Sequence, residues 1–138
     1  GGKRVYPLQG NWECTAADTP ATCPVTAQVL LTLSQIDGAT RRFDAEVLDP
    51  RTLVPLDKAA ILASVAKTNR VVIVQEAVRR GGVASDIASI IQEEAFDYLD
   101  APIKRVCSID APAIYSPHIE HEQLPNPRRI VEKVLTLA

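Results

Sequence analysis

The chain has 138 residues and a mass of 15.0 kDa, which is typical of one domain. Its composition, 46% hydrophobic and 23% charged, is close to that of soluble globular proteins and argues against disorder. The net charge of -2 gives no reason to expect nucleic acid or a membrane surface as partner, and no apolar run approaches the roughly 20 residues that span a bilayer. Because only 4% of residues are aromatic, Val, Ile, Leu and Ala must fill the core, as in α/β layers.

The first half of the chain contains a candidate β-hairpin. Hydrophobic and polar residues alternate over 25–34 and again over 43–48, and the turn dipeptide Asp37-Gly38 lies between them. Hydrophobic residues spaced three or four apart also fit a helix over 25–36. We favour the hairpin and keep the helix as the alternative.

Strands and helices then alternate along the chain. Asp57 is a suitable N-cap for a helix over 58–67, and Asn69 stands where a left-handed residue commonly ends one. The β-branched run Val71–Val74 predicts a strand that is covered on both faces. After the loop Gly81-Gly82, hydrophobic spacing predicts a helix over residues 83–99.

The remainder contains one more strand and one more helix. Residues 103–107 form the strand, and the four prolines within 108–127 predict a long, stiff, extended connection. Pro127 fits the first turn of a last helix over 128–137. This order predicts a three-layer α/β/α domain with a mostly parallel central sheet, in which one strand is antiparallel.

Several short motifs, in a fixed order, are similar to one family. The segment Ala45–Asp57 resembles A-E-V-[IL]-D-L-R-T-L-x-P-x-D, and Ser64–Val74 resembles S-V-x-K-T-G-R-x-V-x-V. Further matches follow at Glu76-Ala77, Gly81-Gly82, Ile91–Glu94, Ala101–Val106, Tyr115–Pro117 and Leu124-Pro125. These motifs resemble the C-terminal, transketolase-like domain of the beta subunits of thiamine-diphosphate-dependent 2-oxo acid dehydrogenases of the pyruvate, branched-chain 2-oxo acid and acetoin types.

The chain departs from this family at several points. Gln75 replaces the usual His, Asn69 the usual Gly, and Pro50 the usual Leu, while Ser108-Ile109 replaces a Gly-containing pair. The first 43 residues do not resemble the family. We therefore predict two parts, an atypical segment 1–43 and a transketolase C-terminal-like domain 44–138.

The resemblance implies a role in a larger enzyme. That enzyme oxidatively decarboxylates a 2-oxo acid with thiamine diphosphate and magnesium, and it passes the acyl group to lipoyl groups. In the family, other domains hold the cofactor, so we expect no catalytic, cofactor-binding or metal-binding residue in this chain and no activity of the chain alone. The domain would instead assemble subunits and wall the active site.

The same resemblance implies the partners and the location. The partners would be an alpha subunit, a second beta subunit and the dihydrolipoyl acyltransferase core, and the location would be a bacterial cytoplasm or a mitochondrial matrix. The stretch Tyr115–Pro127 and the last helix are candidate contact surfaces. The alternative class is a free-standing interaction or small-anion-binding module derived from this domain.

Two groups of residues are candidates for a site. Gln75 and Glu76 follow the strand Val71–Val74, at the edge where α/β sheets place their ligands, and with Arg79, Arg80 and Tyr115 they would form an active-site rim or an interface. A capped strand end is the structural alternative. The pair Gly81 and Gly82, which precedes a helix, is a candidate anion site, although Ser85 and Asp86 could equally cap that helix.

Other polar residues carry weaker signals. His118 and His121 have an H-x-x-H spacing, but their proline-flanked segment lacks a helical pattern to present both rings on one face. Cys107 ends an apolar strand, where thiols are usually inert, and the pattern places Glu93, Glu94 and Asp97 on a solvated helix face. The chain has three cysteines without a C-x-x-C spacing, which fits a reducing compartment.

Overall fold

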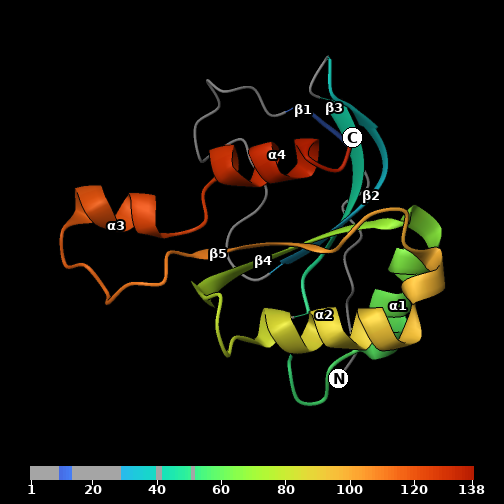
Figure 1. The fold of residues 1–138 in the computed structure, drawn as a ribbon, viewed down its shortest axis with the longest axis horizontal. Helices are drawn as coiled ribbons and strands as arrows, with labels where there is room; N and C mark the ends of the chain where they lie inside the picture. Colours follow the sequence, from blue (N-terminus) through green and yellow to red (C-terminus); the bar gives the residue numbers. More distant parts are fainter. Residues whose placement is uncertain (1–9, 14–28, 40–41, 51) are drawn as a thin grey trace.

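The computed structural model describes residues 10–13, 29–39, 42–50 and 52–138 (Figure 1). These residues form a five-stranded sheet with helices on both faces. In chain order the elements are β1 (Gly10–Glu13), β2 (Val29–Asp37), β3 (Arg42–Leu48), α1 (Lys58–Thr68), β4 (Arg70–Val78), α2 (Val83–Glu94), the 3-10 helix η1 (Phe96–Tyr98), β5 (Lys104–Ser108), α3 (Pro117–Gln123) and α4 (Pro127–Leu135).

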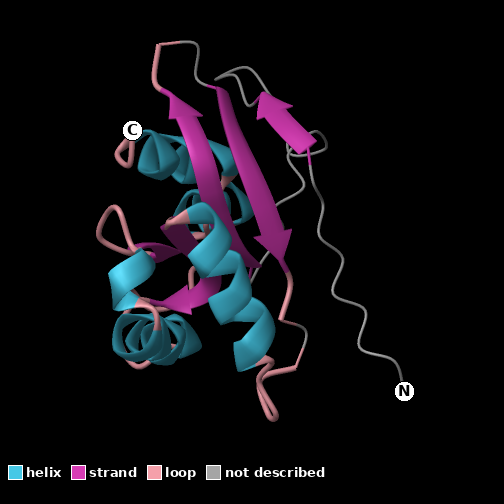
Figure 2. Cartoon of the chain, turned by 90° about the vertical axis from the view of Figure 1, so that its right-hand side faces the viewer, coloured by secondary structure: helices cyan, strands magenta, loops and turns pink. Residues whose placement is uncertain are grey.

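The sheet separates two hydrophobic cores. Helices α1 and α2 cover one face and α4 covers the other (Figures 1 and 2). Side chains of α1 and α2 such as Val65 and Ile91 pack in the first core, and Val131 and Val134 of α4 pack in the second. The predicted α/β class and its three layers are confirmed.

Strand β4 lies in the middle of this arrangement, between β2 and β5. Val72 and Val74 belong to the α4 core, whereas Val71 and Ile73 belong to the core under α1 and α2. None of these four side chains is more than 3% exposed. Alternate side chains of a strand point to opposite faces, so the continuous β-branched run fills both cores at once, as predicted.

The pairing of the strands differs from the predicted mostly parallel sheet. The strand order is β1-β3-β2-β4-β5, and only the β4–β5 pair is parallel among the described strands. Strands β3, β4 and β5 do run in one direction, as the strand-helix-strand order predicts, but β2 lies antiparallel between β3 and β4.

The short connection between β2 and β3 explains this difference. β2 ends at Asp37 and β3 begins at Arg42, and a parallel crossover needs a dozen or more residues. The hairpin prediction is therefore confirmed for its two strands, Val29–Asp37 and Arg42–Leu48, and the helix alternative is wrong over 29–36. Residues 25–28 lie outside the described residues.

Helices α1 and α2 begin and end for local reasons. The Asp57 carboxylate accepts a hydrogen bond from the Ala60 N–H at 3.2 Å, and Asn69 ends α1 with a φ of 69°. Helix α2 ends at Glu94, earlier than predicted. The segment after it is tied to the end of α1, because the Asn69 side chain donates to the Tyr98 carbonyl at 2.7 Å and the Asp100 N–H donates to the Asn69 carbonyl at 2.9 Å.

The predicted extended connection 108–127 is wrong in its second half, which contains α3. Pro117 occupies the first turn of α3, where a missing N–H costs nothing, and no proline follows until Pro125. Helix α3 stands beyond the end of β5 (Figure 1). Asn126 then caps α4 by accepting from the Arg129 N–H at 3.0 Å. None of the helices in the described part of the chain is long and apolar enough to cross a bilayer.

Candidate functional site

Gln75 ties the strand β4 to the start of α2. Gly82, the N-cap residue of α2, has no side chain to cap the helix. The buried Gln75 side chain performs this role, because its Oε1 accepts a hydrogen bond from the Ala84 N–H at 2.7 Å. Its Nε2 donates to the Val78 carbonyl at 2.9 Å, which fixes the end of the strand. Both polar atoms of Gln75 therefore bond within the protein.

The two glycines of the candidate anion site have different structural roles. Gly81 has a φ of 65°, a left-handed conformation that favours glycine. A Cβ atom on Gly82 would lie 2.0 Å from the Gln75 Nε2 atom, so only glycine leaves room for this side chain. Two N–H groups of this helix start are already bonded, because the Ala84 N–H donates to Gln75 and the Ser85 N–H donates to the Gly82 carbonyl at 2.8 Å.

The other predicted rim residues lie on the surface. Glu76 is exposed, and its carbonyl accepts a hydrogen bond from the Ser108 hydroxyl of β5. Arg80 forms an exposed ion pair with Asp110 at 2.6 Å, which links the loops that follow β4 and β5. Tyr115 is 100% exposed, in the connection before α3. The structure thus brings Gln75 together with Gly82, and the remaining predicted residues are solvent-facing.

An apolar pocket of about 120 Å³ adjoins the Gln75 cap. It lies between the connection that follows β3, the strand β4 and the start of α2. Its lining includes Leu53, Ile73, Val83 and Ile87, and Gln75 contributes an amide that is already bonded. This pocket suits a small apolar group better than a charged one.

A second pocket, of about 450 Å³, lies at the end of β5 beside α4. We call it the basic pocket, because its lining contains four cationic side chains, Arg79, Arg105, Arg129 and Lys133. Sequence reasoning found only Arg79, because Arg105 and the pair on α4 each lie more than twenty positions further along the chain and share no motif with it. A helical pattern places Arg129 and Lys133 one turn apart on α4, but this spacing alone indicates a shared helix face and not a pocket.

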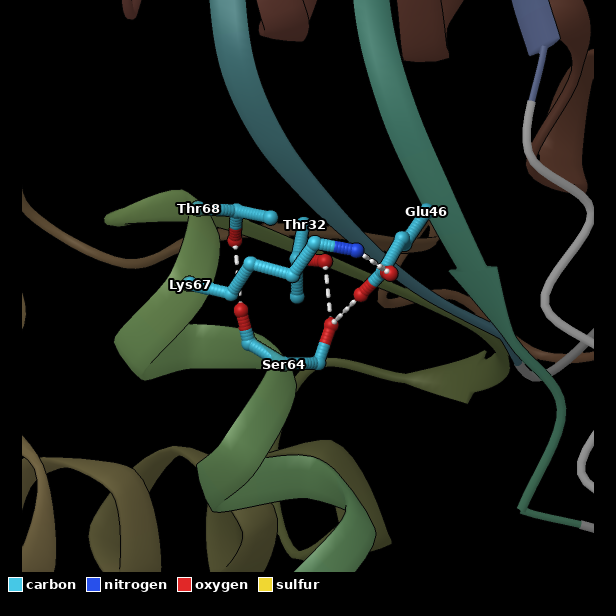
Figure 3. Close-up of polar contacts among 5 residues, drawn as sticks. All are labelled: Thr32, Glu46, Ser64, Lys67 and Thr68. Carbon is cyan, nitrogen blue, oxygen red and sulfur yellow. Dashed lines mark hydrogen bonds and ion pairs between the residues drawn. The ribbon is translucent and has the colours of Figure 1, made fainter.

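Four polar residues join β2, β3 and α1 (Figure 3). The Ser64 hydroxyl donates to Glu46 Oε2 at 2.5 Å, so the Thr32 hydroxyl must donate the bond that joins it to Ser64 at 2.6 Å. The Lys67 ammonium pairs with Glu46 Oε1 at 2.5 Å. Thr32 is 0% and Ser64 5% exposed, so neither hydroxyl is an accessible nucleophile. The group instead holds α1 against β2 and β3.

The remaining sequence candidates do not converge on a centre. His118 and His121 lie on the exposed surface of α3, where the expected lack of helix was wrong. No group of three or more His, Cys, Asp or Glu side chains that could hold a metal occurs within the described ranges. Cys107 is a buried free thiol, and Glu94 forms an exposed ion pair with Lys58, while Glu93 and Asp97 are exposed.

The parallel succession of β3, β4 and β5, joined through α1 and α2, defines an α/β domain whose main polar contacts serve packing. Sequence comparison gives the family. The family described as "Transketolase, C-terminal domain" matches residues 17–130, and the chain belongs to it. This match begins before residue 43, so it includes part of the segment that the motifs left outside the resemblance.

Curated relatives confirm the resemblance to dehydrogenase beta subunits. The chain is 48% identical over 97 residues to the acetoin:2,6-dichlorophenolindophenol oxidoreductase subunit beta of Bacillus subtilis, a match that covers 70% of this chain and 28% of the relative. It is 48% identical over 92 residues to the pyruvate dehydrogenase E1 component subunit beta of Rickettsia conorii, covering 67% and 28%. The mitochondrial pyruvate dehydrogenase E1 component subunit beta of Dictyostelium discoideum is 39% identical over 93 residues, covering 67% and 26%. The chain thus spans 26–28% of the length of these relatives.

Proposed function

We propose that this chain supplies the assembly and active-site-wall domain of a 2-oxo acid dehydrogenase beta subunit. The observation that supports this proposal is the 48% identity to two beta subunits, one named for acetoin and the other for pyruvate. In the whole enzyme the reaction would be oxidative decarboxylation of a 2-oxo acid, with transfer of the acyl group to lipoyl groups. The domain itself would position subunits, because its buried polar side chains Gln75, Ser64 and Thr32 are bonded within the fold.

The described residues do not fit thiamine diphosphate and magnesium. They contain no group of three or more metal-ligating side chains, and the Ala84 N–H that could face a diphosphate is bonded to Gln75. We therefore derive no step through the cofactor, and we propose that other parts of the enzyme hold it. Calorimetric titration of this chain with thiamine diphosphate should show no binding that depends on magnesium, and magnesium-dependent micromolar binding would overturn the assignment.

The proposed active-site rim consists of the exposed residues Glu76, Arg79 and Arg80. Glu76 lies near the carboxyl end of β4, and Arg79 and Arg80 follow that end, where an α/β sheet commonly faces its ligand or a neighbouring domain. Gln75 would support this rim from below, because it fixes the strand end from which these residues extend.

The proposed contact surface lies around α3. Ile109, Tyr115 and Ile119 are 50%, 100% and 53% exposed, although each is large and apolar. We call these three residues the α3 surface. Burying them against an alpha subunit, a second beta subunit or the acyltransferase core would remove apolar area from water, which stabilises an interface by about 25 cal/mol per Å² before the costs of association.

Hydrogen bonds of the buried residue Gln123 hold the segment that carries the α3 surface. The Gln123 Nε2 atom donates to the carbonyls of Ala111 at 3.1 Å and Pro112 at 3.2 Å, and its Oε1 atom accepts from the Ile114 N–H at 3.3 Å. The Ile109 N–H donates to the Gln123 carbonyl at 3.0 Å. A segment fixed in this way loses less entropy on docking than a free loop.

Light scattering tests the assembly role. The chain is measured alone, with an alpha subunit of a pyruvate dehydrogenase E1 component, and with the corresponding alpha and beta subunits together. A rise in mass on mixing, which Ile119→Asp weakens, is the expected result. The matched control is Val54→Asp, because Val54 is 94% exposed and lies in the connection before α1. An unchanged monomer in every mixture would refute the proposal and favour the free-standing interaction module.

A further inference from the structure

Four cationic residues from three parts of the fold line the basic pocket. Arg79 follows β4, Arg105 lies on β5, and Arg129 and Lys133 lie on α4. Arg105 bonds to Ser85 of α2, whereas α4 covers the opposite face of the sheet, so the pocket lies across β5, an edge strand of the described sheet. A volume of about 450 Å³ is within the range of small-molecule sites.

The charges of this pocket are not balanced within the described residues. Its lining contains two carboxylates, Asp110 and Glu132, which leaves a formal excess of two positive charges. Asp110 is paired with Arg80 at 2.6 Å and Glu132 with Arg128 at 3.4 Å, and neither Arg80 nor Arg128 lines the pocket. None of the four lining cations forms an ion pair inside the described ranges.

Two of these cations are held in place by neutral acceptors. The half-buried Arg129 guanidinium donates to the carbonyls of Cys107 at 2.7 Å and Leu124 at 2.9 Å. The half-buried Arg105 donates to the Ser85 hydroxyl at 2.5 Å. A guanidinium has five N–H donors, so each retains donors for a ligand, and its fixed position reduces the entropic cost of binding. Ordinary surface arginines are solvated and mobile, which distinguishes this pair from a charged face.

We propose that the basic pocket binds a small phosphate-type dianion, either inorganic phosphate or the phosphoryl group of a small metabolite. Arginine forks match phosphate oxygens in bidentate geometry, and Lys133 and Arg79 add point charges at the exposed side. The pocket does not include Gly81 or Gly82 of the predicted anion site, beside which the Ala84 N–H is bonded to Gln75. This inference does not depend on the assembly role.

Isothermal titration calorimetry of the full chain at low ionic strength tests the proposal. Inorganic phosphate and glucose 6-phosphate are the two probes, since they separate a free ion from a phosphoryl group on a metabolite. Arg79→Gln and Lys133→Gln are the test variants, because neither side chain forms a hydrogen bond or ion pair among the described residues and the fold should persist. Each should weaken binding about threefold to fivefold, as expected for partly exposed charges.

Two further variants distinguish a specific binding site from a general electrostatic attraction between the chain and anions. Lys104→Gln makes the same change in net charge on β5 outside the pocket lining and should leave the Kd unchanged. Glu132→Gln removes a carboxylate from the lining and should tighten binding by a similar factor. The proposal is supported by saturable binding in which Glu132→Gln binds most tightly, the unchanged chain and Lys104→Gln bind equally, and Arg79→Gln and Lys133→Gln bind more weakly. It is overturned if neither probe binds, if Lys104→Gln weakens binding as much as Lys133→Gln, or if an acidic peptide such as oligoglutamate binds while both phosphate probes do not.

Discussion

Replacing Gly82 by alanine tests the lock between β4 and α2. The new Cβ atom would lie 2.0 Å from Gln75 Nε2 and 2.9 Å from the Val78 carbonyl oxygen, so the Gln75 amide must move. Its hydrogen bonds to the Ala84 N–H and the Val78 carbonyl would then be lost. A buried polar group without its partner costs about 1–3 kcal/mol, so Gly82→Ala should lower the free energy of unfolding by about 2–4 kcal/mol.

A double-mutant cycle measured by urea unfolding isolates the cause. Gln75→Ala removes the side chain that the new Cβ would meet, so Gly82→Ala should cost at least about 1 kcal/mol less in that background. Gly81→Ala is the matched control. A Cβ there meets nothing within 4 Å, so its cost, about 1 kcal/mol from the left-handed backbone, should be equal in both backgrounds.

Equal costs of Gly82→Ala in the two backgrounds would refute this reasoning. The penalty would then come from the backbone at Gly82 or from the Val78 carbonyl, and the Gln75 side chain would not cap α2. The reasoning would also be refuted if Gly82→Ala lowered the free energy of unfolding less than Gly81→Ala does. The Gln75 side chain would then tolerate the new Cβ atom.

Four further outcomes follow from the structure. Ser64→Ala removes the bonds to Glu46 and Thr32 and should cost about 1–3 kcal/mol in urea unfolding, whereas Thr32→Val should cost less in the Ser64→Ala background. Asp57→Ala removes the α1 cap and should cost about 1 kcal/mol, seen as a lower thermal midpoint. Lys58→Gln, which breaks the exposed pair with Glu94, should change stability by less than about 1 kcal/mol in the same assay. A chain that begins at residue 44 should lose cooperative unfolding in circular dichroism, because β4 would lose its neighbour β2; a sharp transition of that chain would contradict the central position of β2.

Local signals predicted the elements of the fold well. The Asp57 cap, the left-handed Asn69 and the run Val71–Val74 each act within a few residues, and the structure confirms all three. The failure to predict α3 also has a local cause. Pro117 fits an extended chain, but proline equally favours the first turn of a helix. The predicted helix over 83–99 was too long, because contacts of residues 98–100 with Asn69 override its hydrophobic spacing.

The candidate site was harder to predict, because its contacts join distant residues. Gln75 was assigned to a rim from its position at a strand end, and its buried amide became evident only when Ala84 and Gly82 were placed beside it. The basic pocket joins residues 79, 105 and 129, which no periodicity relates. Only the turn of α4 between Arg129 and Lys133 was visible beforehand, and it indicates a helix face and not a pocket.

The position of β2 shows that the folded domain begins before the motifs that carry the resemblance, as does the family match over residues 17–130. The motifs of the family begin after residue 43, and that boundary stays a prediction about resemblance. The sheet nevertheless continues across it, since β2 pairs with β3 on one side and β4 on the other. Leu30, Thr32 and Leu33 are each at most 1% exposed, so β2 fills both cores and separates β3 from β4. A strand at this position screens Val71–Val74 from solvent whatever its direction, and the four-residue connection 38–41 allows only the antiparallel one.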